Sequence, residues 1–290
     1  MQKFSKIGII GVGFVGGAAK QYFSAIQESS SEGTQPIELF LYDKFKGMGS
    51  VAEVNRAEVV FIATPTPYDP EKGFDLSAVE DAIKILDGQK VVVIKSSVVP
   101  GTTEALQKKF PNHKILFNPE FLREISAYED FIHPDKQIVG YTENSREVAE
   151  AVLELLPKAP YGKAMPAIEA EAVKYMANSF LAMKVVFANE FYDICKKLGI
   201  DYEVVSEAVV QDPRIGNSHF DVAHGGYRGY GGSCFPKDVN AIIELAKKSG
   251  HDTKFLKAMR EINRELLSQS GVDEEYFLLN KHKANAGKKS

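Results

Sequence analysis

A short apolar run that ends in closely spaced glycines limits what this chain can fold into. Lys6–Ile10 has the continuous hydrophobic character of a buried strand, and Gly11–Gly16 (GVGFVG) follows it at once. Apolar residues with helical spacing then run over Phe14–Ile26. A strand, a glycine-rich turn and a helix in this order are typical of the first unit of a dinucleotide-binding sheet.

Strand-like and helix-like segments go on alternating over residues 1–165. Together they predict an α/β fold whose N-terminal part is a Rossmann-type, doubly wound parallel sheet. The further strands are expected at Ile37–Tyr42, Val59–Ala63, Lys90–Lys95, Lys114–Phe117 and Gln137–Gly140, and helices at Leu76–Leu86 and Thr102–Phe110.

The pattern becomes helical after a change of composition at Pro157–Pro166. Apolar residues recur three to five positions apart over Ile168–Leu198, which predicts one long helix of roughly 30 residues. Two shorter helices broken near Ala188 are the alternative. We therefore expect a Rossmann domain over 1–165, a long central helix with an all-helical second domain over 166–270, and a tail over 271–290. Further helices are expected at Tyr202–Val210, Val239–Lys248 and Thr253–Ser268.

Bulk properties exclude several kinds of partner. The net charge of -4 argues against nucleic acid, and no apolar run approaches the length of about 18 residues that a membrane helix needs. The first six residues lead directly into a strand and leave no room for a signal peptide, so a reducing cytoplasm is expected. The long helix carries an apolar stripe that one small domain cannot cover, which predicts a homodimer through that helix.

The glycine turn predicts a cofactor site in which each glycine has a geometric role. Gly11 permits the tight turn, and Gly13 lets the backbone approach a pyrophosphate. Gly16 lets helix and strand pack closely. Phe14 and Val15 begin the helix whose N-terminus would face the phosphates.

A carboxylate and two hydroxyl-rich loops are expected to complete the cofactor site. Asp43 ends the second strand, where it can accept from both ribose hydroxyls and would repel a 2′-phosphate, so NAD is favoured over NADP. The alternative for Asp43 is a plain turn residue. Thr64-Pro65-Thr66 and Ser96-Ser97 each follow a strand end and could line the nicotinamide half, although such residues are common in any loop.

One of the two cysteines has the setting of a nucleophile. Cys234 lies within Gly231–Asp238 (GGSCFPKD), between a glycine run that lets a substrate come close and a Lys-Asp pair. A nearby ammonium would favour the thiolate. Cys195, on the long helix, is expected to be a small buried hydrophobe. A thiol nucleophile and a nicotinamide in one chain indicate oxidation at the aldehyde level, through a thiohemiacetal and a thioester.

Two further pairs of polar residues have helical spacing. Lys174 and Asn178 share a helix face, and because Asn is a poor helix former we expect it to have a specific partner. An exposed pair is the alternative. Asn118-Pro119-Glu120 predicts an N-cap followed by Pro at the first helical position, which would put Glu120 and Glu124 on one face. Carboxylates there could also simply stabilise the helix dipole. The six histidines have no metal-ligand spacing, so no metal is expected.

Taken together, these residues resemble the UDP-glucose/GDP-mannose dehydrogenase family. The resemblance runs from the glycine turn to about Leu267. Its most specific stretches are Asn118–Glu124, Glu171–Glu190 and Gly231–Asp238. It implies that the chain uses two NAD to oxidise the C6 alcohol of a nucleotide sugar to a carboxylate. UDP-glucose is the expected substrate, and GDP-mannose is the alternative.

The resemblance also assigns roles to residues. It implies that Cys234 attacks the aldehyde and that Lys174, with Asn178, stabilises the C6 oxygen. Asp238 and either Glu120 or Glu124 would handle water and its protons, and Ser97 stands where many members carry Thr. Glu124 would also contact NAD, and Arg214 would reach the substrate of a neighbouring subunit. The implied substrate contacts are Glu120, Phe121, Leu122, Glu124, Lys174, Asn178, Arg214, Tyr227, Gly229, Tyr230, Gly231 and Lys237.

The main departure from the family is at the C-terminus. Family members continue with a second Rossmann-like domain that completes the nucleotide pocket, whereas this chain ends at Ser290. We therefore expect a weak KM with the chemistry preserved, because uniform binding energy affects KM more than kcat. An inactive NAD-binding protein that pairs with a full-length partner is one alternative. A hydroxyacid or 6-phosphogluconate type of dehydrogenase, which would not need Cys234, is another.

Overall fold

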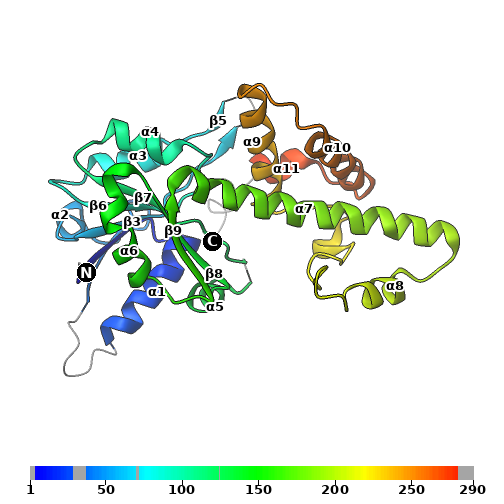
Figure 1. Ribbon diagram of the computed structural model, residues 1–290, viewed down its shortest axis with the longest axis horizontal. Coiled ribbons are helices and arrows are strands. Elements are labelled where there is room, and N and C mark those ends of the chain that lie inside the picture. Colours follow the sequence, from blue (N-terminus) through cyan, green and yellow to red (C-terminus); the bar gives the residue numbers. More distant parts are fainter. Residues whose placement is uncertain (1–3, 29–36, 70–71, 124, 280–290) are drawn as a thin grey trace, which may run out of the picture. The chain divides into compact units, whose positions relative to one another are not determined.

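The computed structural model describes residues 4–28, 37–69, 72–123 and 125–279 (Figure 1). The chain divides into two compact units. The first comprises Met1–Pro67 and Phe74–Lys174, and the second comprises Tyr68–Gly73 and Tyr175–Ser290. None of the helices in these described ranges combines the length and hydropathy that a bilayer span requires.

The first unit is built on a seven-stranded sheet with the order β2-β1-β3-β6-β7-β8-β9. Neighbouring strands are parallel except β7 and β8, which pair antiparallel. β2 and β3 lie on opposite sides of β1, so the turn after β1 lies where the strand order reverses, the place where open α/β sheets bind ligands. The strands are β1 (Lys6–Ile10), β2 (Glu38–Tyr42), β3 (Val59–Ile62), β6 (Val91–Ile94), β7 (Lys114–Phe117), β8 (Lys136–Tyr141) and β9 (Tyr161–Pro166).

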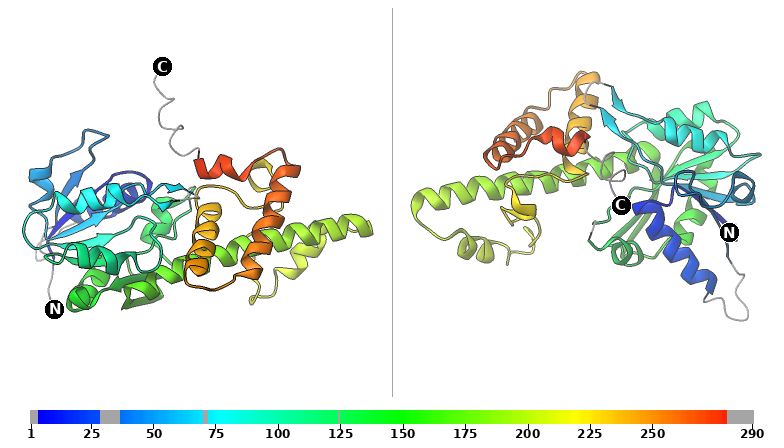
Figure 2. Two further views of the ribbon diagram at one scale, coloured as in Figure 1. Left: turned by 90° about the horizontal axis from the view of Figure 1, so that it is seen from above. Right: turned by 180° about the vertical axis from the view of Figure 1, so that it is seen from behind.

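Helices cover both faces of this sheet, as Figure 1 and Figure 2 show. In the inner strand β3, Val59 and Phe61 belong to one apolar cluster with α1, α5 and α6, whereas Val60 and Ile62 belong to another with α2, α3 and α4. Burial on both faces explains the continuous apolar runs of the strands, and the expected Rossmann-type fold is confirmed. The helices are α1 (Phe14–Glu28), α2 (Val51–Val54), α3 (Ser77–Lys84), α4 (Thr102–Lys109), α5 (Ala127–Ile132) and α6 (Ala149–Leu155), with a 3-10 helix η1 (Glu143–Val148) before α6.

One local prediction in the first unit is wrong, and one strand of the sheet was not predicted. The segment 118–123 is irregular, so the expected helix with Asn118 as N-cap is wrong. Asn118 is instead fully buried at the end of β7, and its side chain donates to the Gln137 side chain and the Ile138 carbonyl on β8. The segment Tyr161–Pro166, where only a change of composition was noted, is strand β9. Pairing with β8 outweighed its weak strand signal.

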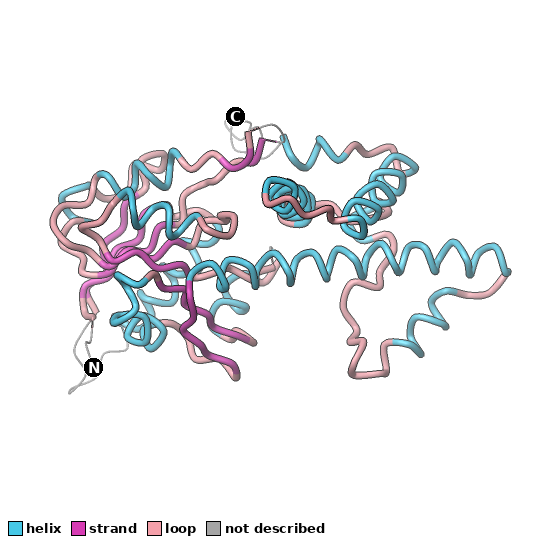
Figure 3. The backbone as a smooth tube through the Cα atoms, turned by 45° about the horizontal axis from the view of Figure 1, so that its top comes forward, coloured by secondary structure: helices cyan, strands magenta, loops and turns pink. Residues whose placement is uncertain are grey.

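α7 (Ala167–Leu198) is a single unbroken helix of 32 residues, visible as one continuous coil in Figure 3. The prediction of one long helix is therefore confirmed, and the expected length is about 48 Å. Ala188, the suggested break, is buried, as is Cys195. Cys195 packs with Ala188, Tyr202 and Val222, so the prediction that it is a small buried hydrophobe is confirmed.

The second unit consists mainly of helices packed on α7. Ala182 and Val186 of α7 share an apolar cluster with Val239 and Ile243 of α9 and Met259 of α10. The last helix, α11, lies in the segment that the sequence leaves as a tail. The elements are α8 (Tyr202–Val209), a 3-10 helix η2 (His224–Gly226), α9 (Phe235–Lys248), α10 (Lys254–Gln269) and α11 (Glu274–Leu279), and a small two-stranded sheet is formed by β4 (Tyr68–Asp69) and β5 (Gly73–Phe74).

Candidate functional site

The glycine turn after β1 has the geometry that its sequence predicts. Gly11 has a left-handed φ of 85°, and a Cβ there would lie 2.7 Å from a carbonyl oxygen of the loop after β3. A Cβ on Gly16 would lie 1.9 Å from the Gly11 carbonyl oxygen, so only glycine allows α1 to pack this closely. Gly13 faces open space just before Phe14 and Val15, at the start of α1. This open helix start fits the pyrophosphate of a dinucleotide.

Asp43 closes the glycine turn from the end of β2. Its Oδ2 accepts from the Val12 N–H at 2.8 Å, and its Oδ1 accepts from the N–H groups of Phe45 and Lys46. Lys46 Nζ also donates to the Val12 carbonyl at 2.6 Å. Asp43 is therefore a turn residue, as in the alternative given above, and its side chain also holds the glycine loop in place. Oδ2, which accepts from the Val12 N–H, has a second lone pair with which it can accept a ribose hydroxyl.

The hydroxyl-rich loops after β3 and β6 are bound to each other. Thr66 Oγ1 donates to the Ser97 carbonyl at 2.8 Å, and Ser96 Oγ donates to the Thr64 carbonyl at 2.7 Å. Pro65 is exposed between them. The Thr64 hydroxyl is buried and has no hydrogen-bond partner within the described residues. An unpaired buried hydroxyl beside the glycine turn fits a polar ligand such as a nicotinamide amide.

A buried lysine connects the ends of β6 and β7. Lys95 is 5% exposed, its Nζ donates to Asn118 Oδ1 at 2.5 Å, and it lies 5.4 Å from the ring centroid of Phe131. Burial lowers the pKa of Lys95 to about 8; the nearby Lys174 ammonium adds to this effect, whereas the Glu120 carboxylate opposes it. Because β6 and β7 are parallel and adjacent, Lys95 fixes the position of the loop that carries Glu120.

Lys174 and Glu120 form a buried ion pair in the first unit. Lys174 Nζ donates to the Glu120 carbonyl at 2.8 Å and lies 3.3 Å from Glu120 Oε2. The side chains of Lys174 and Glu120 are 3% and 10% exposed. Glu120 Oε1 also accepts from the Leu122 N–H. A lysine and a carboxylate, both implied by the family resemblance, are therefore in direct contact.

Asn178, one turn further along α7, has the specific partner that its helical position predicted. Asn178 Nδ2 donates to Asp238 Oδ2 at 2.6 Å. The other oxygen of Asp238 accepts from Lys237 Nζ at 2.5 Å. Asp238 is fully buried, so its charge is balanced by Lys237 rather than by water.

Cys234 is a free, partly exposed thiol at the N-cap of α9. Pro236 occupies the first turn, and the Asp238 N–H donates to the Cys234 carbonyl at 3.0 Å. Ser233 Oγ lies 3.5 Å from Cys234 Sγ. The sequence predicts the start of this helix at Val239, four residues too late. Pro236 is the signal that would have given the true start, because proline is favoured in the first turn of a helix. The thiol and the Asp238 cluster thus share one helical turn.

The loop before Cys234 contains both buried and exposed side chains. Tyr230 is 2% exposed and its hydroxyl is buried. Tyr227 packs on the ring of Phe277 in α11, with centroids 5.2 Å apart. Gly229 and Gly231 each lack room for a Cβ. Arg214 lies further back, 88% exposed, and pairs with its neighbour two positions away, Asp212.

Two further expected residues, Phe121 and Leu122, lie in the loop after β7. Phe121 packs against one apolar cluster of the sheet and contacts the Lys136 ammonium, and Leu122 packs against the other cluster. Glu124 lies outside the described residues. Among the residues that are described, no group of three or more His, Cys, Asp and Glu could hold a metal ion.

Sequence reasoning missed several buried polar residues. Lys95 and Asn263 are examples, and Glu171 is a third. The Glu171 carboxylate accepts from the N–H groups of Gly101 and Thr103 and from the Thr103 hydroxyl, which caps the start of α4. Burial raises the pKa of Glu171 above its usual value, and these hydrogen bonds offset only part of the increase. A lysine directly after the apolar run Val91–Ile94 is the signal that would have found Lys95, whereas the mixed segments around Glu171 and Asn263 carry no such signal.

Similarity to known proteins covers both units. The NAD binding domain of the UDP-glucose/GDP-mannose dehydrogenase family matches residues 42–157, and the central domain of that family matches residues 168–265. A UDP-glucose 6-dehydrogenase of Haloferax volcanii is 34% identical over 89% of this chain and 69% of its own length. One of Pseudomonas aeruginosa is 39% identical over 74% of this chain, and the match spans 51% of that protein.

Solved structures agree with these matches. A UDP-glucose dehydrogenase of the archaeon Pyrobaculum islandicum has a TM-score of 0.75 at 30% identity, covering 92% of this chain and 71% of its own. A UDP-D-ManNAc dehydrogenase of Pyrococcus horikoshii, at 21% identity and a TM-score of 0.72, shares the fold over 97% of this chain and 72% of its own. The chain therefore belongs to the UDP-glucose/GDP-mannose dehydrogenase family, a family of nucleotide-sugar dehydrogenases, and its cofactor is NAD.

Proposed function

We propose that this chain oxidises UDP-glucose to UDP-glucuronate in a four-electron reaction that passes through a thioester on Cys234. The observation that carries the proposal is the partly exposed, free thiol at the N-cap of α9, one helical turn from the buried Asp238. We propose UDP-glucose as the substrate because several relatives are named UDP-glucose 6-dehydrogenase. A reducing cytoplasm, the compartment expected from the sequence, would keep Cys234 as a thiol.

The proposed chemistry has three stages. The C6 alcohol first loses a hydride and a proton and becomes an aldehyde. The Cys234 thiolate adds to the aldehyde carbon, and with one proton this gives a thiohemiacetal; loss of a second hydride and a proton gives a thioester. Water then cleaves the C–S bond, releasing the carboxylate and the thiol. NAD, when bound, accepts the hydride in each oxidation.

Side chains near each reacting group support these steps. The Lys174 ammonium would stabilise negative charge on the C6 oxygen, with Asn178 beside it on α7. Asp238 and Glu120 are the described carboxylates that would move protons to and from water. Ser97 would contribute its hydroxyl from the loop after β6. The Lys174 and Asn178 side chains are each held by a hydrogen bond, Lys174 to the Glu120 carbonyl and Asn178 to the Asp238 carboxylate.

The test of this function is the number of NADH formed per sugar. With excess NAD and a known, limiting amount of UDP-glucose, we expect two NADH for each sugar, measured by absorbance. One NADH per sugar would contradict the thioester route. No NADH from UDP-glucose, with NAD still bound, would contradict the proposed substrate; GDP-mannose and a full-length partner protein are then the next additions to the assay.

We also propose that the chain forms a homodimer through α7. Seven large apolar side chains of this helix are exposed, and six of them lie on one face, at spacings of three, four and seven. An exposed stripe of this kind is typical of a protein interface, and an isologous pairing of two copies would bury it. The six residues are Met176, Phe180, Phe187, Phe191, Ile194 and Leu198.

Charged substitutions in this stripe should produce a monomer. Phe187 and Phe191, whose rings pack 4.7 Å apart, are the best targets, and Phe187→Asp with Phe191→Asp would place charges in the interface. We expect the sedimentation coefficient of the double variant to be that of one chain, with the wild type sedimenting as two. Lys196→Glu, an exposed change on the same helix, should leave the dimer intact. A monomeric wild type would refute the interface.

A further inference from the structure

A buried asparagine on α10 holds the backbone just before Cys234. Asn263 is fully buried, and its Oδ1 accepts from the Tyr230 N–H at 2.6 Å. Its Nδ2 donates to the Tyr230 carbonyl at 3.0 Å. The side-chain amide therefore pairs with both backbone groups of one residue, as a neighbouring β-strand would. Tyr230 lies four positions before Cys234, so this pair fixes the path of the chain into the nucleophile.

Glycine allows this close approach. Gly229 has φ 83°, and a Cβ there would lie 2.6 Å from Asn263 Oδ1 and 3.2 Å from the Leu266 side chain. The segment also contains Gly231 and Gly232, and Gly232 has φ 72°. Glycines give a chain many accessible conformations, so a run of them holds one shape only where other groups impose it. Asn263 imposes it from α10.

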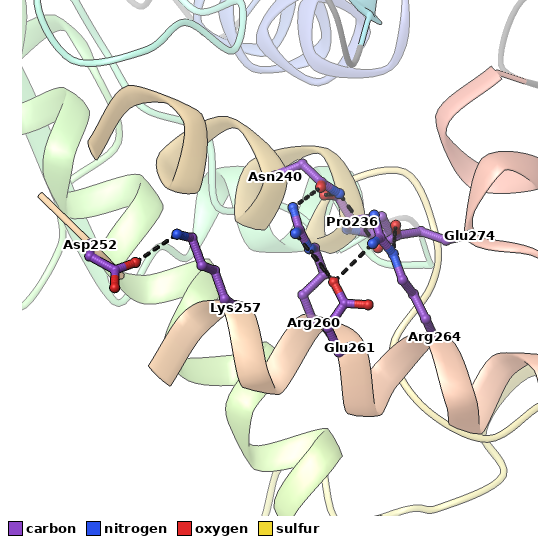
Figure 4. Close-up of polar contacts among 8 residues, drawn as sticks. All are labelled: Pro236, Asn240, Asp252, Lys257, Arg260, Glu261, Arg264 and Glu274. Carbon is purple, nitrogen blue, oxygen red and sulfur yellow. Dashed lines mark hydrogen bonds and ion pairs between the residues drawn. The ribbon is translucent and has the colours of Figure 1, made fainter. Parts of the chain in front are cut away.

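Helix α10 also holds α9, whose N-cap is Cys234. Figure 4 shows the side chains that join the two helices. Arg260 donates to Asn240 Oδ1 at 3.0 Å, and Asn240 in turn donates to the Pro236 carbonyl at 2.8 Å in the first turn of α9. Arg264, one turn along α10, donates to Glu274 of α11 at 2.8 Å. The same helix thus fixes the chain on both sides of the thiol.

A second contact, between Arg228 and residues of α7, holds the same loop two positions before Tyr230. The Arg228 guanidinium pairs with both oxygens of Asp193, at 2.9 Å each, and donates to the side chain and carbonyl of Asn189. This contact is partly exposed, since Asp193 is 47% exposed. The Asn263 contact is buried and two positions closer to Cys234, so it determines the final approach.

We propose that Asn263 is a positioning residue for the Cys234 nucleophile, a role that rests on the proposed function. It does not touch the substrate; it acts through the Tyr230 backbone. Misplacing a reacting group by about 1 Å can lower a rate about 10²-fold, so releasing this backbone should reduce kcat while leaving cofactor binding intact. The glycine turn that binds the cofactor belongs to the other unit of the chain.

Asn263→Asp tests the proposal with almost no change in shape. Asp can still accept from the Tyr230 N–H but cannot donate to the Tyr230 carbonyl, and its charge would face that carbonyl. We expect kcat to fall about 10²-fold, with the Kd for NAD changed less than twofold. Leu267→Ala, a fully buried change on the same helix, is the matched control: it should lower the thermal midpoint through a cavity yet keep kcat within threefold.

Alkylation of Cys234 gives a readout that does not depend on the substrate. Iodoacetamide labelling, followed by mass spectrometry with buried Cys195 as the internal reference, should be at least fivefold faster at Cys234 in Asn263→Asp and unchanged in Leu267→Ala. Equal labelling rates in all three proteins would overturn the positioning role even if no nucleotide sugar is oxidised. A kcat loss in both variants that follows their loss of stability would overturn it as well.

Discussion

Replacing Cys234 with serine is expected to lower steady-state NADH formation from UDP-glucose by about 10³-fold or more. The hydroxyl of serine is not ionised near neutral pH, so it would add to the aldehyde far more slowly than a thiolate does. The aldehyde would then not be captured, and the second hydride transfer would fail. Residual NADH should stop near one per sugar, which absorbance at limiting substrate can measure.

The second thiol of the chain provides the matched control. Cys195 is 2% exposed and packs among apolar residues of α7 and α8, so Cys195→Ser should keep the rate within about twofold while lowering stability slightly. A Cys234→Ser protein that retained more than a tenth of the wild-type rate would argue against a covalent route. It would favour a dehydrogenase of the hydroxyacid type, in which no thiol takes part.

Features set by local sequence were predictable. The turn at Gly11–Gly16 requires a positive φ and a missing Cβ, and glycine is the residue that meets both needs, so the motif implies its own geometry. Strands β1, β3, β6 and β7 are buried on both faces, and their apolar runs could be predicted directly from the sequence. The apolar residues of α7 recur at helical spacing, so this long helix was also predictable from the sequence. Asn178 was expected to have a partner because an amide is out of place in an apolar helix, and Asp238 is that partner.

Features set by distant contacts were not predictable. Asn118-Pro119-Glu120 has the local chemistry of a helix start, but Asn118 is drawn into the sheet by Lys95 on β6 and by Gln137 on β8. These partners are 23 and 19 positions away, and no local pattern reveals them. Tertiary hydrogen bonds of a buried amide outweighed its capping preference.

The same limit applies near the nucleophile. The motif Gly231–Asp238 identified Cys234 and Asp238, but it could not show that Asn263 holds the chain before them. Asn263 lies 33 positions beyond Tyr230, within a helix whose pattern is amphipathic and otherwise unremarkable. The sequence therefore predicts which residue reacts better than it predicts what positions that residue.

Replacing Lys174 with methionine is expected to lower kcat about 10³-fold, because an ammonium that stabilises developing negative charge on oxygen is worth roughly that much. The change also removes the partner of a buried carboxylate. Of the contacts described above, the Glu120 side chain would then keep the hydrogen bond from the Leu122 N–H. Because the buried carboxylate loses its cation, the first unit should be destabilised by about 3 kcal/mol. Loss of activity alone would therefore not separate catalysis from folding.

A double variant separates the two effects. Glu120→Gln removes the charge but keeps the shape, so combining it with Lys174→Met leaves no unpaired charge, and thermal unfolding should show most of the lost stability restored. If Lys174 only balances Glu120, the double variant will be as active as Glu120→Gln alone. If Lys174 acts on the substrate oxygen, kcat of the double variant will remain at least about 10²-fold below that of Glu120→Gln, because no other change replaces the missing cation.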